Sequence, residues 1–111
     1  MADAFLLGLA LRKVLENAIQ YRKNGQPKAK IHIRAKQEEG KWLIVVRDEG
    51  KGIHPDAQGE VLKMFVRGTE ESTGTGLGLY IAEKAVRRME GELKLESEYG
   101  EWTRVVISLG E

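Results

Sequence analysis

The sequence predicts an α+β fold, a two-layer α/β sandwich in which about three helices cover one face of a mixed, mainly antiparallel sheet. Two observations lead to this prediction. Apolar residues recur with helical spacing in some segments and alternate with polar residues in others, and these segments follow one another as helix, hairpin, helices and hairpin. A chain of 111 residues can bury roughly two-thirds of its unfolded surface, so we expect one domain over residues 1–111.

A first helix is expected over residues 7–22. Its apolar residues recur at helical spacing and form one stripe, made of Leu7, Leu11, Val14, Leu15 and Ala18. At about 100° per residue, a second group falls along one flank of that stripe, half-buried and able to face a cavity. Its members are Lys13, Asn17, Gln20 and Tyr21. The helix is expected to stop at residues 24–27, which include a glycine and a proline.

Residues 31–36 and 42–47 are expected to form the strands of a hairpin. Apolar and polar residues alternate in the first segment, which is typical of a strand with one wet face, and His32 lies on that face. The second segment is apolar on both faces, which suggests a central strand. Asp48 follows it with the parity of Val46, so its carboxylate is expected to point inward.

The second half of the chain is expected to contain two helices and a closing hairpin. A short helix is predicted over residues 56–64, and the polar, glycine-containing stretch over about residues 66–76 is predicted to be a lid. A helix over residues 77–90, ended by Gly91, should bury Leu79, Ala82, Ala85, Val86 and Met89. Two alternating segments complete the chain, residues 92–98 and 103–109.

The composition excludes several classes of function. Lysine and arginine number 18 against 17 acidic residues, which leaves no basic excess for binding duplex nucleic acid. The absence of cysteine excludes disulfides, thiolate metal sites and thiol nucleophiles, and it suits a reducing compartment, by default the cytoplasm. The apolar run over residues 5–11 is too short to cross a bilayer, which takes about 20 residues, so we expect no membrane contact by this chain.

Residues 48–53, which read Asp-Glu-Gly-Lys-Gly-Ile, are the first candidate binding segment. An inward carboxylate at a strand end is costly unless it finds donors, and an adenine amino group is one such donor. Glycines beside it clear room for a flat ring. The alternative, equally favoured by this motif, is that Asp48 caps the following turn by bonding backbone. A calcium loop fits poorly, because glycines stand where oxygen ligands should be.

Residues 74–79, which read Gly-Thr-Gly-Leu-Gly-Leu, are the second candidate segment. They run into a predicted helix, whose first N–H groups attract phosphate, so the two segments together predict a nucleotide pocket. The alternative is a flexible linker with a helix cap. A dinucleotide fingerprint is excluded because a polar loop precedes the segment and the third glycine comes one residue early. A Walker loop is excluded because no Gly-Lys-Ser/Thr follows.

Asn17 is the third candidate. Asparagine has poor helix propensity, and its neutral amide oxygen can complete an octahedral Mg²⁺ shell otherwise made of phosphate oxygens and water. The alternative is a plain polar residue on the flank of the helix. Tyr21, one turn later, would either lie over the base or serve as an edge residue with its hydroxyl in water.

With these motifs in this order, the chain resembles the ATP-binding catalytic domain of sensor histidine kinases, in the wider family shared with gyrase, Hsp90 and MutL. Residues 11–21 are similar to the asparagine box of that family and residues 48–53 to its adenine box. Residues 61–67, which include Phe65, are similar to its phenylalanine box, and residues 74–79 to its glycine box. The resemblance covers nearly the whole chain and implies a Bergerat-type ATP-binding fold.

The resemblance assigns Asp48 to the adenine amino group and Asn17 to Mg²⁺, so ATP and Mg²⁺ are the implied ligands. Gly50 and Gly52 would make room for the ring, and Arg67 would approach the phosphates. The other nucleotide-binding residues that it implies are Tyr21, Ile53, Thr73, Gly74, Thr75, Gly76, Leu77 and Gly78. The alternative for Arg67 is a solvated loop cation.

Two departures from the family pattern concern the asparagine box. One turn before Asn17, histidine kinases usually carry a second asparagine and the ATP-hydrolysing relatives carry a catalytic glutamate, but this chain has Lys13. A lysine ammonium cannot act as a general base, so a self-contained ATPase is disfavoured. Gln20 stands where many kinases place a basic residue near phosphate. Our hypothesis is that Lys13 supplies that charge, which makes Asn17, Lys13 and Arg67 the implied catalytic residues.

The resemblance also implies partners, because the phosphoaccepting helical hairpin of the family is absent from this chain. His32 and His54 are expected to be surface residues rather than acceptors. The implied acceptor is therefore a histidine on a dimerisation domain of the same parent protein or of a partner, followed by a response regulator. The parent protein would be either anchored in a membrane or not anchored. The part of it that this chain forms is expected to be monomeric. The alternatives are an anti-sigma-type Ser/Thr kinase, a nucleotide-binding interaction module without phosphotransfer, and a domain that binds no nucleotide.

Overall fold

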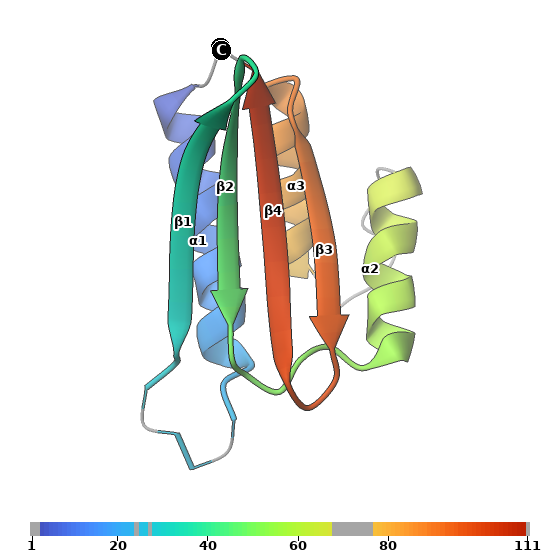
Figure 1. The fold of residues 1–111 in the computed structure, drawn as a ribbon. Helices are drawn as coiled ribbons and strands as arrows, with labels where there is room; N and C mark the ends of the chain where they lie inside the picture. The colour runs from blue at the N-terminus through green and yellow to red at the C-terminus, as the bar shows by residue number, and fades with distance from the viewer. Residues whose placement is uncertain (1–2, 24, 27, 68–76, 111) are drawn as a thin grey trace.

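The computed structural model describes residues 3–23, 25–26, 28–67 and 77–110, and for residues 60, 63–67 and 77 it describes the backbone only. Its helices are α1 (Ala4–Gln20), α2 (Pro55–Arg67) and α3 (Leu77–Arg88) (Figure 1). Its strands are β1 (Ile31–Glu38), β2 (Lys41–Asp48), β3 (Glu92–Glu98) and β4 (Trp102–Gly110). None of the helices in the described residues has the length and apolar character that a membrane crossing needs.

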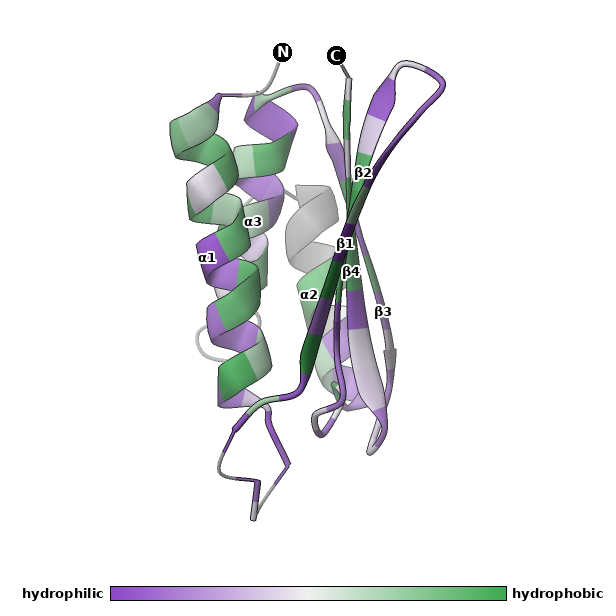
Figure 2. Ribbon diagram, turned by 60° about the vertical axis from the view of Figure 1, so that its left-hand side comes forward, coloured by the Kyte–Doolittle hydropathy of each residue, from purple (hydrophilic) through white to green (hydrophobic). Residues whose placement is uncertain are grey.

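The four strands form one sheet in the order β1-β2-β4-β3, with three antiparallel ladders. The helices lie on one face of this sheet, and no other described element covers the opposite face (Figure 2). The predicted fold class is therefore confirmed, with antiparallel pairing throughout the described sheet. β2 lies between β1 and β4, as its two apolar faces predicted. Glu39 and Gly40, both with positive φ, form the two-residue turn that fixes the register of β1 and β2.

α1 begins three residues before the predicted start and ends two before the predicted end. Asp3 is its N-cap, because its carboxylate accepts hydrogen bonds from the N–H groups of Phe5 and Leu6. The prediction overlooked this signal, an aspartate directly before the apolar run. At the other end Tyr21 is the C-cap, so the helix stops before the glycine and proline that were expected to end it.

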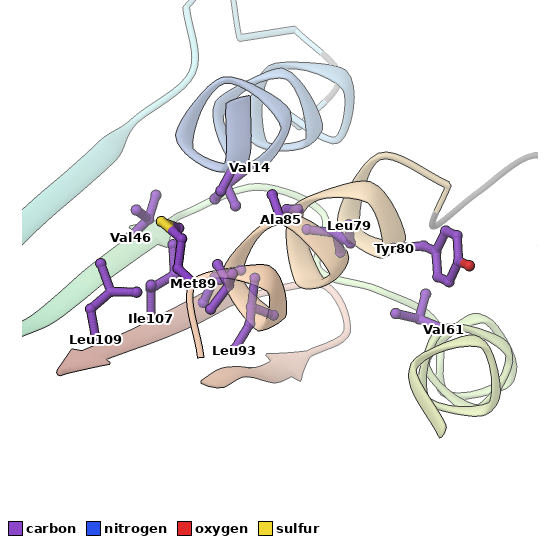
Figure 3. Packing of buried hydrophobic residues seen from close by; sticks show 14 of the residues in the cluster. Val14, Val46, Val61, Leu79, Tyr80, Ala85, Met89, Leu93, Ile107 and Leu109 are labelled. Carbon is purple, nitrogen blue, oxygen red and sulfur yellow. The ribbon is translucent and has the colours of Figure 1, made fainter. Parts of the chain in front are cut away.

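The core lies between the helices and the sheet and is built around α3 (Figure 3). All five α3 residues that were expected to be buried are buried, namely Leu79, Ala82, Ala85, Val86 and Met89. Val14 of α1, Val46 of β2 and Ile107 of β4 belong to the same cluster. The spacing of apolar residues, with a period of 3.6 residues, therefore identified the inner face of α3 correctly.

The ends of α2 and α3 differ from their predicted positions. α2 continues to Arg67, so the first two residues assigned to the lid are helical, and the rest of the lid lies outside the described residues. α3 ends at Arg88, and Glu90, not Gly91, adopts the left-handed conformation with φ +58°. A Cβ on Gly91 would lie 2.5 Å from the carbonyl oxygen of Ser108, so glycine is needed there for close approach of the sheet.

β1 is covered less than its alternating pattern predicted. Ile33 faces the helix side, opposite the buried Val46, yet it is 56% exposed. α1 packs chiefly against α3 and only slightly against the sheet, so β1 beyond Ile31 stays exposed although α1 runs along the same side of the sheet (Figure 1). Alternation shows which side chains share a face, but it does not show whether another element covers that face.

Candidate functional site

Asp48 is the last residue of β2 and is 4% exposed. Its strand neighbours on the helix side are Ile31 and Thr103, so the carboxylate points inward, as its parity predicted. Oδ1 accepts a hydrogen bond of 2.9 Å from the Gly50 N–H, whereas Oδ2 has no hydrogen-bond partner in the described part of the chain. One carboxylate oxygen therefore caps the turn, and the second is available for another donor.

Burial of this carboxylate changes its proton affinity. Desolvation raises the pKa of Asp48 from 3.8 to about 6, and the hydrogen bond from Gly50 opposes that rise. At neutral pH the group is therefore still ionised, and it remains an acceptor. A buried carboxylate with a free oxygen is a strong acceptor for a ligand N–H, because little water competes for it.

The loop after Asp48 is held between two other parts of the fold. The N–H of Lys51 donates a hydrogen bond of 2.7 Å to the Tyr21 carbonyl at the end of α1. On the other side, the Lys51 carbonyl accepts a hydrogen bond from the N–H of Gly100, in the turn between β3 and β4. The loop is thus pinned between a helix end and a hairpin turn.

Gly50 and Gly52 are needed by this packing. A Cβ on Gly50 would collide with the Tyr21 carbonyl oxygen. Gly52 has φ +70°, and a Cβ there would collide with the Glu98 carbonyl oxygen. The chain's own backbone therefore requires both glycines, and their expected second task, making room for a ring, stays a prediction.

A hydroxyl pair beneath the loop was not predicted from the sequence. Ser97 Oγ accepts a hydrogen bond of 2.8 Å from the Ile53 N–H and donates to the Trp102 carbonyl, while Thr103 Oγ1 lies 2.9 Å from it. The side chain of Gln58 donates to the Ile53 carbonyl at 2.8 Å. These bonds fix both backbone groups of Ile53. The signal in the sequence was the inward parity of Ser97 and Thr103, two polar residues at core positions of β3 and β4.

α1 meets the two candidate segments at points two turns apart. Its Tyr21 carbonyl contacts the loop after Asp48, and its Lys13 carbonyl oxygen lies 3.8 Å from the Cβ position of Gly78, at the start of α3. Eight residues separate these points, about 12 Å along the helix. Asn17 stands midway between them on the same side of α1. The tertiary structure therefore brings the first segment, Asn17 and the end of the second segment to one helix face.

Asn17 is buried, with 8% of its surface exposed. Its side-chain amide makes no hydrogen bond within the described residues, and its atoms are not among the fully enclosed ones that lack a partner. Because these atoms are not enclosed without a partner, burial alone does not make Asn17 unfavourable, and its poor helix propensity is the remaining reason to expect a ligand for its amide oxygen. No three acidic, histidine or cysteine side chains cluster in the described residues, so a metal here would depend on this oxygen plus phosphate and water.

The other predicted site residues on α1 differ in their exposure, and several site residues lie outside the described structure. Lys13 is half-buried, and its Nζ lies 3.4 Å from Glu16 Oε1. Tyr21 is half-buried, but Gln20 is exposed, so the expected half-buried position of Gln20 is wrong, because it lies on the outer side of the last turn. The side chains of Phe65, Arg67 and Leu77, and all of residues 73–76, lie outside the described structure.

Both histidines are exposed, as predicted, and each contacts a carboxylate. His32 Nε2 lies 3.2 Å from Glu49 Oε2, and this hydrogen bond lowers the pKa of Glu49. His54 Nδ1 lies 3.7 Å from Asp56 Oδ2, and its ring stands edge-on to Tyr99 at 5.0 Å. Neither ring lies beside Asn17 on α1.

The chain is similar over nearly its whole length to proteins of one family. A family model described as "Histidine kinase-, DNA gyrase B-, and HSP90-like ATPase" matches residues 2–111. Cyanobacterial phytochrome A of Nostoc sp. is 36% identical over 103 residues, which are 91% of this chain and 13% of that protein. Sensor protein BasS of Escherichia coli is 36% identical over 95 residues, which are 86% of this chain and 25% of that protein.

A solved structure shows the same similarity in three dimensions. The mycobacterial sensor histidine kinase MprB matches with a TM-score of 0.73 and 29% identity, over 98% of this chain and 72% of that one. The chain spans 13% of the first of these two sequence relatives and 25% of the second.

Proposed function

The chain belongs to the family of histidine kinase-, DNA gyrase B- and HSP90-like ATPases, and on that premise we propose that it binds Mg-ATP as the catalytic domain of a two-component sensor histidine kinase. It transfers the γ-phosphoryl group to a histidine on a separate domain, which passes it to a response regulator. The phosphoryl transfer takes place in the cytoplasm, where ATP is present, whether or not the parent protein is anchored in a membrane.

The observation that carries this proposal is the position of Asn17 on α1. Asn17 lies between the Tyr21 carbonyl, which holds the loop after Asp48, and the Lys13 carbonyl, which faces Gly78. A molecule that has a base at one end and phosphates at the other would meet Asp48, Asn17 and the N-terminus of α3 in that order. ATP has this form.

At the base end, Asp48 Oδ2 accepts the hydrogen bond from the adenine amino group. Oδ1 is already bound to the Gly50 N–H, which holds the carboxylate in one orientation before the ligand arrives. The support of Ile53 by Ser97 and Gln58 keeps the loop in place as well. Preorganised groups of this kind lose little entropy on binding.

At the phosphate end, the positive end of the α3 dipole and the Lys13 ammonium favour the polyphosphate. The Asn17 amide oxygen holds Mg²⁺, which neutralises charge on the phosphates when it is bound. Residues 73–78 and Arg67 complete this end in the proposal. Phosphoryl transfer needs positioning and charge more than covalent help from the protein.

The transfer itself takes place on an acceptor from outside this chain. A nitrogen of the acceptor imidazole forms a bond to the γ-phosphorus as the bond from that phosphorus to the bridging oxygen breaks, and ADP leaves with that electron pair. Lys13 cannot activate water as a base, which favours transfer to a histidine over hydrolysis. The exposed His32 and His54 do not lie beside Asn17 and are not the acceptors.

The test supplies the missing acceptor. We would fuse a histidine-bearing helical hairpin from a sensor histidine kinase to the front of the chain, since tethering raises its effective concentration, and add γ-labelled ATP with Mg²⁺. The expected result is label on the hairpin that is lost in acid and kept in base, as for phosphohistidine. The matched control replaces the hairpin histidine by glutamine.

Three other results would contradict the proposal in different ways. Acid-stable label would indicate a Ser/Thr kinase. Binding of Mg-ATP in calorimetry without label transfer would indicate an interaction module. No heat of binding with Mg-ATP would mean that the chain binds no nucleotide.

A further inference from the structure

The open face of the sheet carries a compact group of positive side chains. The register places His32, Arg47, Arg104 and Glu96 in one row across all four strands. In the next row on this face, Arg34 lies at the edge of the sheet beside Val45. We call the group of Arg34, Arg47 and Arg104 around Val45 the arginine patch.

The arginine patch surrounds a hollow of about 380 Å³. Three guanidinium groups, the His32 ring and the half-buried Val45 line it. One apolar side chain therefore lies among four basic ones. This combination fits a ligand that carries both an apolar group and negative charge.

The patch is electrostatically unfavourable for the domain alone. Arg47 and Arg104 are direct cross-strand partners on the same face, and like charges in that position destabilise a sheet. Two lysines of this face are paired with carboxylates: Lys36 with Glu38 at 2.8 Å, and Lys94 with Glu92 at 3.3 Å.

Two of the three arginines lack a carboxylate at ion-pair distance in the described part of the chain, although the Glu49 carboxylate, bonded to His32, is near enough to Arg47 for that cation to help lower the pKa of Glu49. Arg104 pairs with Glu96 at 3.2 Å, but neither Arg34 nor Arg47 has a carboxylate within 4.0 Å in the described residues. Arg47 is instead stacked over the Trp102 ring at 5.2 Å, which holds its guanidinium in place while leaving its N–H groups for a partner.

We propose that the arginine patch is a docking surface for an acidic segment of another protein. Carboxylates of that segment bind Arg34 and Arg47 in the bidentate manner that guanidinium groups favour, and an apolar side chain beside them rests on Val45. Carboxylates border the patch on several sides, with Glu38 on β1 and Glu92, Glu96 and Glu98 on β3. They would repel a long phosphate backbone, and this favours a short acidic peptide over nucleic acid.

This surface is separate from the proposed nucleotide site. Asp48 has the opposite parity to Arg47 and faces the helices, so the two sites lie on opposite faces of the sheet. Loss of the arginines should therefore leave the affinity for Mg-ATP unchanged, and either proposal can fail without the other.

The test is a selection from a library of random peptides displayed on phage, with the whole chain as bait. A parallel selection uses the variant R34Q/R47Q/R104Q. A matched control, K36Q/K41Q/K94Q, removes the same charge from the same face outside the patch. The most enriched peptide is then labelled and titrated by fluorescence anisotropy, beside its counterpart with glutamine for each acidic residue and beside a single-stranded DNA.

We expect acidic peptides to be enriched on the wild type and on the lysine variant, and not on the arginine variant. Arg47→Gln alone should weaken the selected peptide about tenfold, the size of one hydrogen bond to a charged group. Enrichment without acidic residues, equal binding of the glutamine counterpart, equal binding by the arginine variant, or tighter binding of the DNA would each overturn the proposal.

Discussion

In the proposed site, Asp48 would combine two tasks that the sequence presented as alternatives. The carboxylate caps its own turn through Oδ1, and we propose that its Oδ2, which has no hydrogen-bond partner in the described residues, accepts from the ligand. The same burial that makes it a good acceptor raises its pKa to about 6. The binding group of the proposed site is therefore also a source of instability in the folded domain.

Asp48→Asn should make the domain more stable and prevent nucleotide binding. At pH 7 the wild type must bury a negative charge, and the amide removes this penalty while its oxygen still accepts from Gly50. A rise of about two pKa units corresponds to at most about 3 kcal/mol. We expect a higher melting temperature at pH 7, measured by circular dichroism, and no heat with Mg-ADP in calorimetry.

The pH dependence of the stability difference between the wild type and Asp48→Asn provides the control. The folded pKa is raised, so the wild type loses stability from this group as the pH climbs from about 4 to about 6, whereas Asp48→Asn does not. Below pH 4 the carboxyl is neutral in folded and unfolded chains, and the two proteins should converge. A constant difference at all pH values would show that another effect is responsible.

Lys13 should contribute to ATP affinity through its charge. Lys13→Ala is expected to weaken Mg-ATP binding about tenfold, the order of one charge-assisted contact, measured by calorimetry. Glu16→Gln is the matched control, because it breaks the 3.4 Å ion pair yet keeps the ammonium, and it should leave the affinity unchanged or improve it. If Lys13→Ala binds as the wild type does, Lys13 is only a partner of Glu16.

The elements around the site depend on one another at the level of backbone contacts. The loop after Asp48 is fixed by a helix end and a hairpin turn, and Gly50 and Gly52 allow these approaches. The sequence predicted glycines that give space to a ligand. The structure adds that the neighbouring backbone already occupies the space beside them.

Gly52→Ala should therefore destabilise the domain by about 2 kcal/mol or more in urea denaturation, since it combines a positive φ with a collision at Glu98. Gly8→Ala makes the same chemical change within α1, where nothing lies within 4 Å, and should stabilise the domain by about 1 kcal/mol. Equal stability of Gly52→Ala and the wild type would contradict the observed packing of the loop.

For the molecule as a whole, nucleotide binding should appear as added stability. A ligand at 100 times its Kd adds about 2.7 kcal/mol, which raises the melting temperature of a domain of this size by roughly 10 °C or more. We expect this shift with ATP and Mg²⁺ and a smaller one with ATP and a chelator. Asn17→Ala should lose the magnesium-dependent part of the shift in melting temperature. Gln20→Ala, a substitution at an exposed position of the same helix, should keep that part. Full retention by Asn17→Ala would exclude it as the metal ligand.

The order of elements, the buried face of α3 and the inward direction of Asp48 followed from the sequence alone. These features depend on local periodicity, which the chain carries in spacings of two and of 3.6 residues. The motifs that mark the family are local as well, and the family match bears out the resemblance drawn from them. The ends of helices were placed less well, because the helix begins and ends at a few local cap hydrogen bonds, those of Asp3 and Tyr21, which the apolar periodicity does not mark.

Only the tertiary structure decided which faces are covered and which distant residues meet. It left Ile33 exposed, set Ser97 and Thr103 beneath Ile53, and aligned Arg47 with Arg104 on the open face. Each of these results depends on which strands pair, in what register, and where a helix comes to rest. Such contacts join residues far apart in the chain, so no local pattern contains them, whereas the pattern that made Asp48 an inward carboxylate is complete within β2 itself.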